Sequence, residues 1–163
     1  MSINLDDYRD CLEQAAPELK GTLDATFQEA SRCMSSVGLQ DYLDGARGLS
    51  ELGRGADLVV SYLENVPAVV KECGEDIIRE CVTSAMKLIS MTSGEVIALL
   101  FSSLPTAARR LGDPELLRGY FSLIHRLAAK APRGLRPMLG CTDELLSKLT
   151  LSGLRRWADF GAD

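Results

Sequence analysis

The stretch "YLENVPAVVKECGED", residues 62–76, places Pro67 inside a segment that otherwise has the apolar spacing of an amphipathic helix. Thirty-eight residues later, "LFSSLPTAARRLGDP" (100–114) repeats the arrangement, with Pro105 in the equivalent place. A proline inside a helix removes a backbone hydrogen bond and ends or kinks the helix. The recurrence indicates a repeated structural unit, and we predict that both helices are kinked, or broken into two short pieces, at the proline.

The similarity between the two stretches extends to their flanks. The same shift aligns Asp57 with Glu95 without a gap, and one further residue of offset aligns "DIIRECVTSAMKL" (76–88) with "ELLRGYFSLIHRL" (115–127). Periods of this length are typical of stacked helix pairs, because each pair leaves an apolar face for the next one. The sequence therefore predicts an all-α fold, a HEAT- or TPR-like α-solenoid of antiparallel helix pairs with a period of about 38 residues, in one domain spanning residues 1–163.

Local signals place the helix boundaries. In "GDPE" (112–115), the Gly is a helix end, the Asp an N-cap and the Pro a first helical residue. "TSGE" (92–95) predicts a capping box in which Thr92 caps the helix and Glu95 reaches back. We expect no strands, and helices at 5–16, 17–35, 38–51, 56–73, 76–90, 94–111, 114–129, 134–149 and 153–160.

Apolar residues at helical spacing predict the buried faces. One such face is Val96, Leu99, Leu100 and Leu104. The other residues expected in the core or between repeats are Leu39, Tyr42, Leu43, Leu58, Leu63, Phe101, Leu116, Leu117, Tyr120, Phe121, Leu145, Leu146 and Trp157. The last predicted helix, which carries Trp157, has no second helix behind it, so we expect the chain to be an N-terminal fragment of a longer protein or to use a partner as its cap.

Composition and targeting signals indicate a cytoplasmic protein. Of 163 residues, 46% are apolar and 25% charged, which suits one folded domain. No apolar run approaches the roughly 20 residues needed to cross a bilayer. The N-terminus "MSINLDDYRD" is acidic, whereas a signal peptide begins with basic residues. We therefore expect no membrane partner.

Residue patterns for catalysis, metals and cofactors are missing from the sequence. The five cysteines are scattered without a CxxC pair, which predicts buried or half-buried thiols. The single histidine, His125, lies in the helical segment "SLIHRLAAK" with no spaced partner, so we interpret it as a packed helix residue. "GRGAD" (53–57) lacks the phosphate-loop pattern and is interpreted as a helix-to-helix turn. We expect no enzyme activity, no cofactor and no metal.

Charge is unevenly distributed along the chain. Residues 1–80 carry 16 acidic and 7 basic side chains, and residues 81–163 carry 7 acidic and 11 basic ones. Such an uneven charge distribution orients a domain on a charged partner. Solvent-exposed faces of different charge that bind no partner would give the same counts of acidic and basic side chains. An acidic chain with few aromatics does not suit nucleic acid. The candidate residues for binding an acidic protein partner are Arg109, Arg110, Arg118, Arg155 and Arg156.

Four segments carry a family resemblance over essentially the whole chain. They are "GRGADLVVSYLENVPAVV", "LPTAARRLGDPELLRGYFSLI", "APRGLRPMLG" and "LTLSGLRRWADFGA". These segments resemble the N-terminal helical region of CbbO/NorD-type proteins, which continue into a von Willebrand factor A domain. The DxSxS metal motif of that domain is absent from this chain.

The resemblance implies a non-catalytic adaptor or scaffold module. Its partner would be the hexameric MoxR-type AAA+ ATPase CbbQ, with Rubisco as client and removal of inhibitory sugar phosphates as the outcome. The alternatives are the equivalent module of a NorD-type protein, which acts with NorQ in the maturation of nitric oxide reductase, or a purely structural helical spacer.

Overall fold

The computed structural model describes residues 5–147, and all regular structure within that range is helical. The elements in chain order are α1 (Leu5–Ala15), the 3₁₀ helix η1 (Pro17–Leu19), α2 (Leu23–Cys33), α3 (Ser36–Glu51), α4 (Ala56–Cys73), α5 (Ile77–Leu88), α6 (Gly94–Leu111), α7 (Pro114–Lys130), the 3₁₀ helix η2 (Pro132–Gly134), α8 (Leu135–Gly140) and α9 (Thr142–Ser147). The predicted all-α fold is confirmed.

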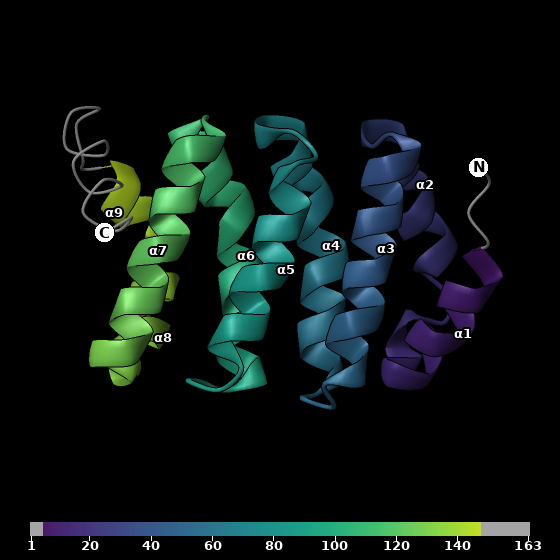
Figure 1. Cartoon of the computed structure of the whole chain (residues 1–163), viewed down its shortest axis with the longest axis horizontal. Helices are drawn as coiled ribbons and strands as arrows, with labels where there is room; N and C mark the ends of the chain where they lie inside the picture. Colours follow the sequence, from purple (N-terminus) through teal and green to yellow (C-terminus); the bar gives the residue numbers. More distant parts are fainter. Residues whose placement is uncertain (1–4, 148–163) are drawn as a thin grey trace.

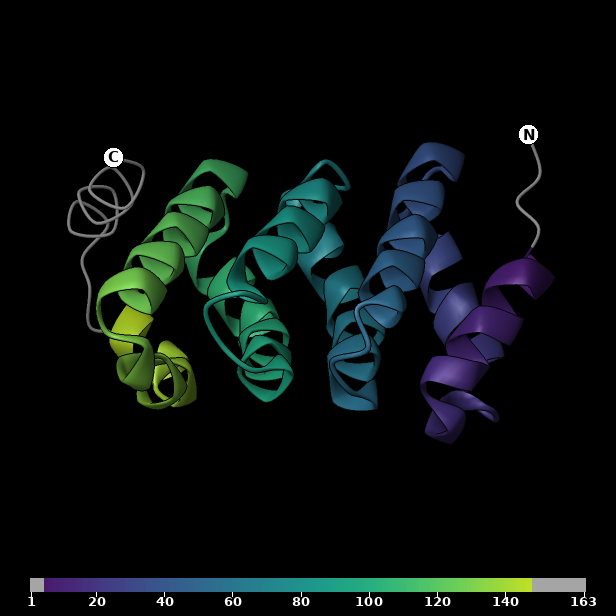
Figure 2. The same cartoon turned by 60° about the horizontal axis from the view of Figure 1, so that its bottom comes forward.

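The helices form two rows that pack against each other (Figures 1 and 2). In one row α1, α3, α5 and α7 are successive neighbours. In the other, α2, α4 and α6 are successive neighbours, and α8 and α9 pack on α6. Neighbours within a row therefore come from successive helix pairs, and the apolar face that one pair leaves open is covered by the next.

Two predicted helices are interrupted. The segment predicted as one helix at 17–35 contains η1 and then α2, and the segment predicted at 134–149 contains α8 and α9, separated at Cys141. Pro17 starts η1 because its fixed φ suits a first helical turn. The predicted helix at 153–160, with Trp157, lies outside the described residues.

The boundary between α6 and α7 is confirmed. Gly112 ends α6 in the left-handed conformation, with φ of 62°. Asp113 is the N-cap of α7, where its side chain accepts a hydrogen bond from the backbone N–H of Glu115, and Pro114 is the first helical residue. These features depend only on neighbouring residues, which is why the sequence predicts them.

The predicted capping box at the start of α6 is wrong by one residue. Ser93, not Thr92, is the N-cap, and its hydroxyl accepts from the N–H of Val96 at 3.3 Å. Glu95 points to another helix and pairs with Arg136 at 3.2 Å. The next residue, Gly94, begins α6 and lies close to the turn before α4, where a Cβ would be 2.3 Å from the carbonyl oxygen of Arg54.

Glu75 lies just before α5 but stabilises a different helix. Its carboxylate accepts hydrogen bonds from the backbone N–H and the hydroxyl of Ser35, at 2.8 and 2.6 Å, at the start of α3. The Ser35 hydroxyl, together with its backbone N–H, lowers the pKa of the Glu75 carboxyl. One acidic side chain thus ties the starts of two neighbouring helices together.

Both helices that contain internal prolines are continuous. α4 runs through Pro67 and α6 runs through Pro105, so of the two predicted alternatives, a kink or a break, the break is wrong. At Pro67, the carbonyl of Leu63 has lost its usual donor four residues later. The hydroxyl of Tyr42 in α3 donates to that carbonyl at 2.5 Å. A side chain from the preceding helix therefore replaces the missing backbone hydrogen bond.

Replacing Tyr42 with Phe should lower the free energy of unfolding by about 1 to 2 kcal/mol, because the buried Leu63 carbonyl would lose its donor. Urea unfolding of the Tyr42→Phe variant measures this loss. In a Pro67→Ala background the backbone N–H of residue 67 can replace the phenol, so the same substitution should cost less. An equal cost in both backgrounds would contradict the compensation.

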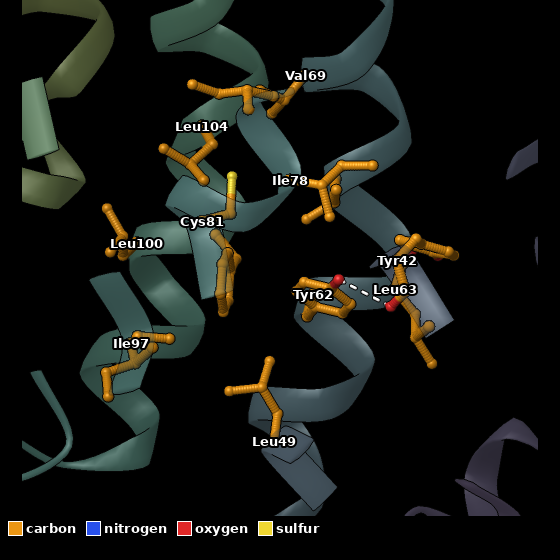
Figure 3. Packing of buried hydrophobic residues seen from close by; sticks show 14 of the residues in the cluster. Tyr42, Leu49, Tyr62, Leu63, Val69, Ile78, Cys81, Ile97, Leu100 and Leu104 are labelled. Atoms are coloured by element: carbon orange, nitrogen blue, oxygen red, sulfur yellow. Dashed lines mark hydrogen bonds between the residues drawn. The ribbon is translucent and has the colours of Figure 1, made fainter. Parts of the chain in front are cut away.

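The core lies between the two rows. Tyr62 is fully buried, stacks on Tyr42 with ring centroids 5.4 Å apart and meets Phe101 edge-on. Its hydroxyl donates to the carbonyl of Tyr42 at 2.8 Å. Figure 3 shows these tyrosines among aliphatic side chains from the surrounding helices. Most residues predicted to be buried are buried, but Leu39, Val96 and Leu145 are only partly so, and Leu99 is exposed.

Candidate interaction surfaces

The predicted partner-binding arginines lie on different rows of the stack. Arg109 and Arg110 are exposed in the last turn of α6, where Arg110 pairs with Asp143 of α9 at 2.8 Å. Arg118 lies in α7, in the other row. Arg155 and Arg156 lie outside the described residues. Arg109 and Arg110 therefore lie together at the end of α6, and Arg118 lies apart from them in the other row.

Arg118 takes part in contacts within the stack. Its guanidinium pairs with Glu80 of α5 at 3.1 Å and with Glu115 of its own helix. A similar pair, Arg79 with Asp41, joins α5 to α3, and each of these two inter-helix pairs spans 38 residues. Surface ion pairs are each worth about 1 kcal/mol or less. Through these contacts, Arg118 helps to hold the neighbouring helices α5 and α7 in position.

α4 and α6 are neighbours in one row (Figure 1). Their side chains leave an open groove between them. We call it the α4–α6 groove. Its volume is about 360 Å³. It is lined by Asp57, Val60, Ser61 and Glu64 of α4, by Glu95, Ala98, Leu99 and Ser102 of α6, and by Arg136 of α8. Each helix contributes positions i, i+3, i+4 and i+7, which form one helical face.

Hydroxyl groups join the two walls of the groove. Ser61 donates to the carbonyl of Ala98 at 2.6 Å, and its oxygen lies 3.2 Å from that of Ser102. The Asn65 side chain donates to the carbonyl of Ser61 at 2.8 Å. Small side chains at these positions let the helices approach while leaving space above them. Leu99 remains 38% exposed beside this contact.

The charges of the α4–α6 groove are mostly acidic. Glu95 pairs with Arg136. Within residues 5–147, Asp57 and Glu64 take part in no ion pair or hydrogen bond through their carboxylates, and both are exposed. Apolar periodicity does not reveal this groove, because it places Leu99 on a buried face. The shift of 38 residues relates all four α4 positions to the four of α6, and would have located the groove.

The thiols differ in exposure. Cys81 is fully buried, and burial raises the pKa of its thiol. Cys11, Cys33 and Cys73 are half-buried, as predicted. Cys141 is exposed, which corrects the prediction for that residue: it occupies the break between α8 and α9, where neither helix covers it.

His125 packs in α7 as a half-buried residue. Its Nδ1 atom is buried without a hydrogen-bond partner among the described residues. Burial lowers the pKa of the imidazole, and the positive charge of Lys87 lowers it further. Protonating His125 is therefore unfavourable in the folded protein.

This environment predicts a pH-dependent stability. The folded-state pKa of His125 is below the unfolded-state value of about 6.5, so the unfolded chain binds more protons as the pH falls through that value. The contribution to stability is therefore complete above pH 6.5 and is lost as the pH falls below it. Urea unfolding at pH 7.5 and 5.5 should show a larger loss for the wild type than for His125→Gln. Equal losses would contradict this environment.

Comparisons with known proteins return no match: no family model, curated protein or solved structure matches this chain. Across residues 5–147, no group of three or more His, Cys, Asp or Glu side chains is arranged to hold a metal ion. No helix in that range combines the length and the apolar character required to span a membrane.

Proposed function

We propose that the chain is a non-catalytic adaptor that binds other proteins through the exposed faces of stacked helices. The observation that carries the proposal is the row formed by α2, α4 and α6, which presents polar and charged side chains outward and has the adjacent pair Arg109 and Arg110 at one helix end. Stacked helix pairs of this kind provide extended binding surfaces. A HEAT- or TPR-like solenoid with a period of about 38 residues is the architecture we propose, and the two ion pairs that span this separation support it.

We propose further, on the resemblance of its sequence, that the module is of the CbbO type and acts with a CbbQ-like MoxR-type AAA+ ATPase in Rubisco activation. The NorD type is the alternative, with a NorQ-like hexamer as the partner. In either case Arg109 and Arg110 would contact an acidic patch, because both are exposed in the last turn of α6. The excess of basic residues in the C-terminal half of the chain supports this polarity.

The test measures association with the hexamer by native mass spectrometry at low salt. The wild-type chain should associate, and the double variant Arg109→Glu with Arg110→Glu should lose most of that association. Arg54→Glu, which reverses an exposed charge in the turn before α4, is the control and should retain it. Arg118 and Arg110 both pair within the stack, with Glu80 and Asp143, so the single variant Arg109→Glu, which breaks no ion pair among the described residues, should also weaken the association.

Three other outcomes separate the alternatives. Association with a NorQ-like hexamer but not with a CbbQ-like one would favour the NorD type. An adaptor that binds through other residues would associate with the hexamer and be insensitive to the double charge reversal. Failure of the wild-type chain to associate with either hexamer would leave the structural spacer as the better account and reject the adaptor role with these ATPases.

A further inference from the structure

We propose that the α4–α6 groove binds a short helical segment of a partner protein, one that carries an apolar side chain flanked by Lys or Arg. The apolar side chain would contact Val60 and Leu99, and the basic side chains would pair with Asp57 and Glu64. The inference deepens the proposed function and rests on it only in taking the chain to be a protein-binding module.

The floor of the groove is apolar and open. Leu99 is one of a few large apolar residues in the described part of the chain that remain more than a third exposed. Val60 and Ala98 are half-buried beside it. Removing apolar surface from water stabilises a complex roughly in proportion to the area covered, so a partner that covers the exposed part of Leu99 gains binding energy.

The charge of the rim selects the partner. Between other neighbouring helices, acidic side chains already have basic partners, as with Glu29 and Lys71 or Asp41 and Arg79. Asp57 and Glu64 have none within residues 5–147. A partner segment with Lys or Arg would supply the missing charges, and charge complementarity of this kind favours specificity and rapid association.

The sequence shift of 38 residues explains why Asp57 has no basic partner in the described part of the chain. Glu95 in α6 pairs with Arg136, which lies 41 residues later. Asp57 is the residue that aligns with Glu95, and the same separation leads from Asp57 to Ala98. Alanine has neither a charge to pair with Asp57 nor the bulk to fill the space above the helix contact. One small residue therefore leaves the carboxylate unpaired and also opens the groove.

The dimensions suit a short helix. Positions i to i+7 of each wall span roughly 10 Å along the helix axis, at about 1.5 Å per residue, which corresponds to about two helical turns. Amphipathic helices commonly bind grooves between helices through residues at i, i+3, i+4 and i+7. The walls thus offer two apolar contacts in the middle and an acidic residue towards each end.

Glu64 extends the acidic character beyond the groove. It also lines a second hollow, of about 270 Å³, between α2 and α4. Glu29 lines the same hollow, but its carboxylate is occupied by Lys71, and that lysine lowers the pKa of Glu29. Glu64 therefore lies between the two hollows with a carboxylate that is unpaired among the described residues. A basic side chain of the partner that pairs with Glu64 would contact the lining of both hollows.

The probe for this groove is a fluorescein-labelled peptide of about 15 residues, since shorter isolated helices are marginal in water. It is Ala-based, with Leu on one face and Lys beside it, and the control peptide has Glu in place of each Lys. Fluorescence anisotropy with the full chain should show binding of the Lys peptide only. Absence of binding at about 1 mM of the chain, near the limit of weak association, would overturn the proposal.

Two matched pairs of variants locate the binding. Asp57→Lys with Glu64→Lys should weaken binding about tenfold, whereas Asp10→Lys with Glu18→Lys, an equal charge change at exposed sites near the other end of the chain, should change it less than about twofold. Leu99→Ser should likewise weaken binding about tenfold, and Val37→Ser, at a residue that is 66% exposed outside the groove, should not. Equal losses within either pair would overturn the site.

Circular dichroism should show that all of these variants fold, because the substituted side chains are exposed. The hexamer measurement then separates the two proposals. If groove variants bind the Lys peptide normally while Arg109 and Arg110 remain essential for association with the hexamer, the groove inference fails and the adaptor function stands. If the peptide binds in the groove but no hexamer associates, the groove stands and the assignment of that partner fails.

Discussion

Replacing Tyr62 with Ala should lower the free energy of unfolding by about 3 to 5 kcal/mol, the range for removing a large aromatic side chain from a core. Tyr62 is fully buried and contacts the rings of Tyr42 and Phe101, so it connects α3 to α6 through α4. Its removal opens a cavity where the two rows meet. Domains of this size are stable by about 5 to 15 kcal/mol, so the variant would lose a large part of the total.

Urea unfolding monitored by circular dichroism measures this loss, and Tyr62→Phe is the matched control. The control keeps the ring contacts and removes only the hydrogen bond from the Tyr62 hydroxyl to the carbonyl of Tyr42, so it should cost about 1 kcal/mol. If Tyr62→Ala cost no more than Tyr62→Phe, the ring would not be a central packing element and the arrangement of α3, α4 and α6 would be wrong.

Two glycines of α3 should respond in opposite ways to the same substitution. A Cβ at Gly45 would lie 2.5 Å from the Tyr62 hydroxyl oxygen and 2.5 Å from a methyl carbon of Val82. Gly45→Ala should therefore lower the free energy of unfolding by about 2 kcal/mol, because overpacking outweighs the better helix propensity of alanine. A Cβ at Gly48 would meet only the flexible end of Met86, at 3.2 Å.

Gly48→Ala is accordingly the matched control for Gly45→Ala. It should be neutral or increase the free energy of unfolding by up to about 1 kcal/mol, since alanine is the better helix former. The same urea experiment measures both variants, and the expected difference between them is about 2 to 3 kcal/mol. A stabilised Gly45→Ala variant would show that α3 does not approach α4 and α5 as closely as the structure has it.

The sequence predicted features that depend on a few neighbouring residues. Gly112, Asp113 and Pro114 end one helix and start the next through their own backbone preferences and one local hydrogen bond, so the boundary between α6 and α7 is where the pattern placed it. The apolar spacing of α4 and α6 likewise predicted that Leu63, Leu100 and Leu104 are buried.

The candidate site was predicted only in part. Exposure of Arg109 and Arg110 agrees with a binding role, but Arg118 pairs within the stack, because Glu80 of the neighbouring helix lies within reach of its guanidinium. Helical spacing placed Leu99 with Leu100 and Leu104 on one face, yet Leu99 lines the α4–α6 groove and remains 38% exposed. The width of a buried helix face depends on how closely the neighbouring helices pack. The spacing of apolar residues in the sequence does not give that distance between helices.

By itself, then, the sequence determined that the chain is helical and where most helices begin and end. Only the tertiary structure decided how Pro67 is accommodated, which carboxylates find a partner and where a groove remains open. The physical reason is the distance along the chain over which each interaction acts. Caps and apolar periodicity act over one or two turns, whereas the bond from Tyr42 to Leu63 and the unpaired state of Asp57 depend on side chains brought together by packing from helices far apart in the chain.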